Sequence, residues 1–152
     1  MEISYTQLLE ETLEVLDKNR IWVLSTSHID IVTSRSMSII NIGLDIYFQT
    51  GNCYVKHNQM AKNKNVSLCW NNISIEGIAE EIGNWKDERN QDLLALYKEK
   101  HKASYEAYGM LEVQVVYKVK SKKVKYWKYM DGKPVREVLH IDEKRAERLN
   151  YI

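Results

Sequence analysis

The chain has 152 residues, of which 44% are hydrophobic and 28% charged, and its formal net charge is +1. This length suits a single domain with its own core, and the near-zero charge gives no global field that would attract nucleic acid. No run reaches the roughly 18 apolar residues of a membrane helix, and the acidic, amphipathic N-terminus is unlike a secretion signal. We therefore expect a cytoplasmic protein with neither a membrane nor a nucleic acid as its partner.

The first predicted elements are a helix and a buried strand. Residues 4–18 carry a helical apolar stripe, and Ser4 with Gln7 fits a capping box at its start. Residues 21–26 form a near-continuous apolar run, typical of a strand that is buried on both faces. His28 and Asp30 follow in a turn, which we interpret as a solvated hairpin tip rather than an acid–base pair.

Residues 31–40 predict a second strand with an unusually polar middle. On a pleated strand, Thr33, Arg35 and Met37 share one face, and serines occupy the other. The local sequence leaves two interpretations open. The strand is either a sheet edge with a solvated arginine, or it aims Arg35 at a ligand anion among small hydroxyls that can donate hydrogen bonds.

A third strand at residues 45–50 is followed by a break at Gly51 and by helical sequence over residues 53–64. The start of a helix offers free backbone N–H groups and the positive end of its dipole, which together suit an anion. Thr50 and Lys56 lie on either side of this start. A solvated surface lysine is the alternative interpretation of Lys56.

The remaining elements are predicted with less detail. Strands are expected at 66–70 and 73–82, with Gly77 marking a bulge or the close approach of another backbone. Residues 85–101, preceded by Asn84 as a cap, and residues 104–108, stopped by Gly109, predict helices. A strand is expected over 111–129 with a turn at 121–123. Its lysines are interpreted as the wet face of an outer strand rather than an RNA-binding surface.

Asp131 and Gly132 predict a hairpin before a last strand at 135–141, and residues 142–150 predict a short charged helix or a fraying tail. We thus expect one domain: helix 4–18, barrel core 21–82, helical insert 84–108, closing strands 111–141 and C-terminal tail 142–152. Cys53 and Cys69 have no metal-like or CxxC spacing, so both are expected to be free thiols, and no metal site is predicted.

Several segments, taken in order, resemble the pyridoxamine 5′-phosphate oxidase-like flavin-binding split barrels. The resemblance rests on the Leu-Ser-Thr of the first strand, Arg35-Ser36-Met37 in the second and Tyr47-Phe48-Gln49-Thr50 closing the third. Lys56 then opens a helix that runs toward Asn63-Lys64-Asn65, and Glu76-Gly77-Ile78-Ala79 follows. The lysine-rich strand with Tyr126-Trp127 is similar to the segment that closes the barrel in this family.

The resemblance implies a mainly β, α+β fold, a six-stranded antiparallel Greek-key split β-barrel of the FMN-binding type. It also implies a homodimer with FMN at the subunit interface. Carried over by position, Arg35 and Lys56 would bind the FMN phosphate, Thr50 would donate to it, and Ser36 and Met37 would lie along the flavin. The expected cofactor-binding set is Arg35, Ser36, Met37, Gln49, Thr50, Lys56 and Asn72, the last at a place where some members have a flavin-contacting glutamine.

Two positions depart from the vitamin B6 oxidases of this family. Those enzymes carry a lysine where this chain has Ile40, and an arginine where it has Val55. Oxidation of vitamin B6 is therefore not expected. The sequence favours an FMN-binding oxidoreductase acting on a small molecule, with NAD(P)H as a possible electron donor and no assignable protein acid or base. The alternative is a non-catalytic carrier or sensor that binds flavin, or haem, on the same scaffold.

Overall fold

A computed structural model describes residues 1–150 of the chain. Its strands are β1 (Glu2–Ile3), β2 (Ile21–His28), β3 (Ile31–Ser38), β4 (Ile40–Ile42), β5 (Asp45–Gly51), β6 (Asn65–Trp70), β7 (Ile73–Glu81), β8 (Gln114–Met130), β9 (Lys133–His140) and β10 (Arg145–Asn150). Its helices are α1 (Tyr5–Lys18), α2 (Val55–Lys62), η1 (Glu88–Asn90), α3 (Gln91–Lys100), α4 (Lys102–Ser104) and η2 (Tyr105–Gly109, a π-helical turn).

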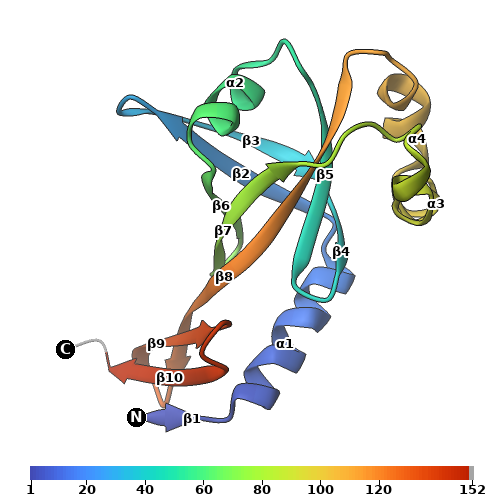
Figure 1. Cartoon of the computed structure of the whole chain (residues 1–152). Helices are drawn as coiled ribbons and strands as arrows, with labels where there is room; N and C mark the ends of the chain where they lie inside the picture. Colours follow the sequence, from blue (N-terminus) through green and yellow to red (C-terminus); the bar gives the residue numbers. More distant parts are fainter. Residues whose placement is uncertain (151–152) are drawn as a thin grey trace.

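The helix α1 forms as its sequence predicts. Ser4 precedes its first turn and accepts a hydrogen bond from the Gln7 backbone N–H through Oγ at 3.3 Å. Leu8, Thr12 and Leu16 form its buried stripe. This stripe packs on the main core, which fills the space between α1 and the sheet (Figure 1).

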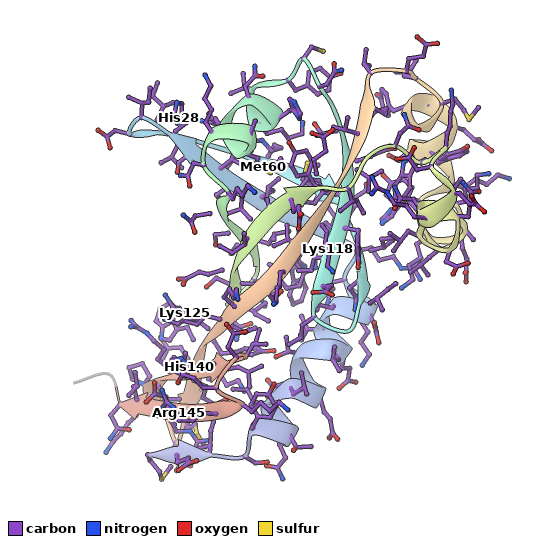
Figure 2. All side chains as sticks on the ribbon, in the orientation of Figure 1. His28, Met60, Lys118, Lys125, His140 and Arg145 are labelled. Atoms are coloured by element: carbon purple, nitrogen blue, oxygen red, sulfur yellow. The ribbon has the colours of Figure 1, made fainter. Side chains whose placement is uncertain are left out.

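The long strand β8 organises the antiparallel sheet. Its first half pairs with β5 and its second half with β9, and β7 runs along its other edge. The ladder continues from β7 through β6 and β2 to β3. Figure 2 shows Lys118 and Lys125 along β8, with His140 and Arg145 where β9 and β10 extend the sheet beyond it, and His28 near the tip of the β2–β3 hairpin.

The sheet opens between β3 and β5. Ile39 separates β3 from β4, and its backbone N–H donates to the Arg20 carbonyl oxygen at 2.9 Å. The strand β3 pairs with β2, whereas β4 pairs with the first residues of β5. Within residues 1–150, the edge of β3 that faces away from β2 has no strand partner. The last residues of β5 likewise have no strand partner on the edge that faces away from β8. This gap, which we call the split, leaves backbone donors and acceptors unpaired.

The mainly antiparallel, α+β architecture agrees with the sequence, but the expected count of six strands is not what residues 1–150 contain, since they form ten. Part of the excess arises because the segment 31–42 bends at Ile39 and divides. The rest arises because β1, β9 and β10 extend the sheet beyond the barrel strands. Residues 145–150 are strand β10, paired with β9, instead of a charged helix or tail. Residues 151–152 of the predicted tail lie outside the described residues.

The turn predicted at 121–123 is wrong, because β8 continues through it as a bulged strand. Ser121 pairs with Gly77 and Lys123 with Glu76, so Lys122 is the extra residue. The prediction for Gly77 is confirmed. A Cβ there would lie 2.6 Å from Val119 Cγ1 and 2.7 Å from the Lys120 carbonyl oxygen, so only glycine fits this close approach.

The helical insert covers the outer face of β4, β5 and β8 with a second core. Trp85 and Tyr97 of the insert pack there against Ile40, Tyr47 and Val116. The helix expected from residue 85 starts later, because residues 85–87 form a turn and Glu88–Asn90 a 3₁₀ turn. Among residues 1–150, every helix is too short or too polar to cross a membrane.

Candidate functional site

A hollow of about 260 Å³ lies at the split. It is bordered by β3, the end of β5, the start of α2, the helical insert and the start of β8. Its lining residues are Ser36, Met37, Ser38, Gln49, Thr50, Gly51, Tyr54, Lys56, Tyr97, Ser104, Tyr108 and Gln114. Five of the seven predicted cofactor-binding residues are therefore brought together here: Ser36, Met37, Gln49, Thr50 and Lys56.

Arg35 lies on the same face of β3 as Thr33 and Met37, as the strand alternation predicted. Its guanidinium donates to Thr26 Oγ1 at 2.7 Å and, in a very short contact, to Thr33 Oγ1. Within residues 1–150 it has no carboxylate partner, and burial lowers its pKa. Arg35 is thus oriented by neutral hydroxyls, which leave its positive charge uncompensated.

Lys56 is the second cation and lies in the first turn of α2. Its Nζ sits 4.7 Å from the centre of the Tyr54 ring, a cation–π contact. Burial, and then the positive charge of Arg35, lower the pKa of Lys56. No acidic side chain among residues 1–150 forms an ion pair with either cation. Two neighbouring, partly buried cations without a counter-charge are a suitable site for an anion.

Thr50 and Gln114 add unused polar atoms to the same hollow. Thr50 is 3% exposed and Gln114 is 4% exposed. Thr50 Oγ1 and Gln114 Oε1 are buried without a hydrogen-bond partner in the described chain. A buried hydroxyl without a partner costs free energy that a ligand oxygen can recover. The Thr50 hydroxyl, as a donor, and the two cations fit a phosphate group, whereas Gln114 Oε1 is an acceptor and suits a ligand donor.

Gln49 lines the hollow, but its amide is already occupied. Its Oε1 accepts from Trp85 Nε1 at 2.8 Å, and its Nε2 donates to Ser104 Oγ at 3.2 Å. Ser104 Oγ in turn lies 3.0 Å from the Tyr97 hydroxyl. Gln49 therefore holds the helical insert against β5. Sequence reasoning missed Tyr97 and Ser104, because the contact joins positions 55 residues apart and no local pattern encodes it.

Comparison with solved structures supports one fold. A Clostridium acetobutylicum protein related to general stress protein 26, of the pyridoxine phosphate oxidase family, superposes with a TM-score of 0.70 at 16% identity, covering 93% of this chain and 99% of that one. A pyridoxamine 5′-phosphate oxidase-related, FMN-binding protein from Nostoc punctiforme gives 0.64 at 13%, covering 99% and 97%. The chain has the pyridoxamine 5′-phosphate oxidase-like fold.

A third structure with this fold, an FAD-binding protein from Mesorhizobium loti, has a TM-score of 0.62 at 13% identity and covers 76% of this chain and 90% of that one. No family model matches the chain, and no curated protein matches it in sequence. At these identities the pyridoxamine 5′-phosphate oxidase-like fold is confirmed, and the chemistry must be argued from the site itself.

At two positions, Ile40 and Val55, this chain has apolar residues where the vitamin B6 oxidases that it resembles carry cations. Ile40 is 1% exposed and packs in the second core, where a charged side chain would lack a partner. Val55 lies at the start of α2 and is 59% exposed. Neither position supplies a positive charge to the split.

Asn72 is not brought to the hollow. It lies in the β6–β7 turn, where its Nδ2 donates to the Trp127 carbonyl oxygen at 2.8 Å. It lines a separate hollow of about 410 Å³, whose other residues are Cys69, Asn71, Ile73, Ser74, Lys125, Tyr126, Trp127 and Arg136. Within one protomer, Asn72 and the two cations thus belong to different surfaces.

Three of the four histidines have protein partners. His57 Nδ1 lies 2.8 Å from the Tyr117 hydroxyl, a buried phenol whose pKa is raised to about 12 by burial. His101 Nε2 lies 2.7 Å from the Ile39 carbonyl oxygen, and His140 Nε2 2.8 Å from Glu147. Among residues 1–150 no group of His, Cys, Asp and Glu side chains is arranged to hold a metal ion, and Cys53 and Cys69 are free and exposed.

Four of the six lysines of β8 pair with nearby carboxylates. Lys118 lies 3.4 Å from Asp45, Lys122 lies 2.9 Å from Asp142, and Lys125 contacts Glu76. Lys128 reaches both Glu11 and Glu137. Their charges are thus locally neutralised, in contrast to those of Arg35 and Lys56.

Proposed function

We propose that this protein is an FMN-binding oxidoreductase of the pyridoxamine 5′-phosphate oxidase-like family. The observation that carries the proposal is that Lys56 and the unpartnered Thr50 hydroxyl line one hollow, and that Arg35, although it is not one of the lining residues, lies close enough to Lys56 to lower its pKa. A phosphate monoester carries close to two negative charges and three acceptor oxygens. It would satisfy both cations and the hydroxyl together.

FMN is favoured over FAD by the same charges. FMN ends in a monoester phosphate, whereas each phosphate of FAD has one ester bond and one anhydride bond to the other phosphate and carries a single charge. Two adjacent cations suit the dianion better. One similar structure is described as FMN-binding and another as FAD-binding, which supports a flavin in this fold without choosing between the two.

The remaining predicted residues have distinct proposed roles. Ser36 and Met37 lie in β3, whose second edge has no strand partner within residues 1–150. Backbone groups of successive residues point to alternate edges, so one of these two residues directs its N–H and C=O to the open edge, where they can hydrogen-bond the flavin ring. Met37, 8% exposed, offers an apolar contact. A bound flavin supplies hydride or electron transfer, while the protein binds and orients it and excludes water. Gln49 acts by fixing the insert that borders the site.

A homodimer with the flavin at its interface completes this proposal. The hollow of one protomer, about 260 Å³, is below the roughly 300–1,000 Å³ typical of ligand pockets, so a second copy would supply the missing surface. Asn72, which lies on another surface of its own protomer, is retained as a proposed flavin contact across that interface. Analytical ultracentrifugation tests the dimer directly.

An absorption spectrum of the purified protein tests the cofactor. We expect flavin bands near their usual positions and release of FMN on denaturation. A protein that is colourless and takes up no FMN at micromolar concentration would contradict the proposal. Arg35→Ala should weaken FMN binding by about 1.5–3 kcal/mol, the cost of losing a hydrogen bond to a charged group. Lys62→Ala, at the far end of the same helix as Lys56, should leave the dissociation constant unchanged.

A non-catalytic flavin carrier is the second candidate. It is favoured by one observation: among residues 1–150, the side chains lining the hollow include no histidine, aspartate or glutamate that could transfer a proton. Oxidation of NAD(P)H by the FMN-loaded protein separates the two candidates. Turnover supports the oxidoreductase, and tight FMN binding without turnover supports the carrier. The same spectrum would reveal haem.

A further inference from the structure

The wall of the hollow is neutral apart from one residue. Of its twelve lining residues within the described chain, only Lys56 carries a charge. In the proposed function, Lys56 and Arg35 together neutralise the two charges of the cofactor phosphate. The surface left for a second ligand then consists of hydroxyls, amides, a thioether and aromatic rings.

Two tyrosine residues border this hollow, one just before α2 and the other in η2, and about half of each residue is exposed. Tyr54 immediately precedes α2 and is 50% exposed, and Tyr108 lies in the π-helical turn η2 and is 52% exposed. The third tyrosine, Tyr97, is 1% exposed and its hydroxyl is hydrogen-bonded to Ser104, so it belongs to the core of the insert. Exposed rings beside a pocket favour stacking on a planar ligand.

Tyr54 and Tyr108 differ in their contacts with the rest of the protein. The Tyr54 ring supports Lys56 Nζ and lies against Gly51, where a Cβ would approach the ring to 3.1 Å. The side chain of Tyr108 makes no hydrogen bond within residues 1–150, although its backbone caps the turn by accepting from Leu111. Its ring is therefore available to a ligand. π-Helical turns such as η2 often occur at functional sites.

The insert that carries Tyr108 is fixed at its base. His101 is 9% exposed and binds the Ile39 carbonyl oxygen, and the Gln49 amide binds Trp85 and Ser104. These contacts tie the insert to both edges of the split, to the β3–β4 bend on one side and to β5 on the other. Tyr108 thus follows a segment that is anchored to the sheet at His101 and Ser104, and such anchoring lowers the entropic cost of binding.

We propose that the second ligand of this site, the substrate of the proposed oxidoreductase, is a neutral planar aromatic molecule that stacks on Tyr108. Within one protomer, an anionic ligand would enter a wall whose single cation, Lys56, is used by the cofactor phosphate, and a charge without a partner is disfavoured there. This inference rests on the proposed function, because it assigns Lys56 and Arg35 to the cofactor.

A matched pair of probes tests the inference on the FMN-loaded protein. Menadione and 1,4-naphthoquinone-2-sulfonate share one ring system. At the same ring position menadione carries a neutral methyl group, and the other compound carries a negatively charged sulfonate. Binding to the oxidised protein is followed by calorimetry and by the change in flavin absorption. We expect menadione to bind at least about tenfold more tightly than the sulfonate. Equal or tighter binding of the sulfonate would overturn the inference.

The variant Tyr108→Ala supplies the second measurement. It should weaken menadione binding by about two- to tenfold, the range of one aromatic stacking contact, when wild type and variant are compared at full FMN occupancy. The control Tyr129→Ala removes an equally accessible ring, 65% exposed, from the far end of β8 and should leave menadione binding unchanged. Wild-type affinity for menadione in Tyr108→Ala, with normal FMN loading, refutes the role of Tyr108. A chain that takes up no FMN at all refutes the proposed function instead.

Discussion

Lys56 of α2 and Arg35 of β3 lie close enough to repel each other. Burial and the neighbouring guanidinium hold the pKa of Lys56 below its ordinary value, and within residues 1–150 no carboxylate offsets either charge. The folded chain therefore maintains an electrostatic cost that an anion would remove. Binding sites can retain groups that destabilise the folded protein, because their role there is to bind a ligand.

The first prediction concerns how FMN affinity depends on pH. The pKa of Lys56 is lowered in the free protein and should rise when a phosphate binds, because the anion stabilises the ammonium. Affinity should then fall as the pH rises through the free-protein pKa of Lys56, starting below the ordinary lysine value of about 10.4. It should also fall below about pH 6, where the phosphate gains a proton. Fluorescence titration with FMN across pH 5–11 measures both limbs.

Lys56→Arg is the control for the alkaline limb. The guanidinium keeps its proton beyond pH 12, so the alkaline loss of affinity should be reduced in this variant. Ionisation of the flavin ring is the same in both proteins, so the difference isolates Lys56. Identical alkaline limbs in the two proteins would remove Lys56 from the phosphate site.

The second prediction concerns the unpartnered Thr50 hydroxyl. Thr50→Val keeps the shape of the side chain and removes a buried oxygen that has no partner in the described chain. We expect the ligand-free protein to be as stable as the wild type or more stable by about 1 kcal/mol. FMN binding should weaken by about 1.5 kcal/mol, because a hydrogen bond to the charged phosphate is lost. Urea unfolding and FMN titration give the two values.

Thr12→Val makes the same substitution where the hydroxyl is used. Thr12 is fully buried, and its Oγ1 donates to the Leu8 carbonyl oxygen at 2.8 Å and lies 3.0 Å from the Tyr126 hydroxyl. This variant should lose about 1–2 kcal/mol of unfolding free energy and keep its FMN affinity. If both valine variants are destabilised alike, Thr50 is not an unsatisfied ligand donor.

Local sequence patterns predicted one side of the split well and the other poorly. The alternation of Thr33, Arg35 and Met37 follows from strand geometry alone, and the cap at Ser4 from neighbouring residues. Local patterns did not predict the split, which only the family resemblance implied, because Ser38, Ile39 and Ile40 look like one continuous strand. The bend at Ile39 depends on β2 and β5, which capture the two halves of the segment separately.

The same reason explains why the anchoring contacts of Gln49 were not predicted. A glutamine beside Thr50 at a strand end is equally compatible with a ligand contact and with a contact to a distant segment. Only the tertiary structure places Trp85 and Ser104 on its amide. Residues that contact a local partner were thus predictable, and those fixed by contacts many positions away were not.

The third prediction separates the structural role of Gln49 from a direct cofactor role. Gln49→Met keeps the length of the side chain but leaves Trp85 Nε1 and Ser104 without their partner. We expect a loss of about 1–3 kcal/mol of unfolding free energy. Hydrogen exchange should accelerate in residues 84–109 and stay unchanged in β6. Gln7→Met, on the exposed face of α1, should change neither quantity, and uniform acceleration throughout the chain would contradict a local anchoring role.

The fourth prediction concerns acid stability at the end of the molecule opposite α2. Glu137 is 4% exposed and receives hydrogen bonds from Lys128 at 2.6 Å and from Arg148 at 2.6 and 2.9 Å. Burial alone would raise the pKa of Glu137, but these bonds and charges hold it below its ordinary value. Lys128 also binds Glu11 of α1 at 2.7 Å, so the cluster joins α1 to β8, β9 and β10.

Because the pKa of Glu137 is lower in the folded state, its contribution to stability is complete above the unfolded carboxyl pKa of about 4.3. That contribution is lost as the pH falls through the folded value. Glu137→Gln should cost about 1–3 kcal/mol at pH 7, because two partly buried cations lose a carboxylate, and its stability should depend less on pH below 5. Glu143→Gln removes a carboxylate that is 64% exposed and pairs with Arg145 at 3.4 Å, so it should change stability by less than about 1 kcal/mol. Thermal unfolding from pH 3 to 7 distinguishes the two variants, and parallel curves for wild type and Glu137→Gln would show that the acid sensitivity originates elsewhere.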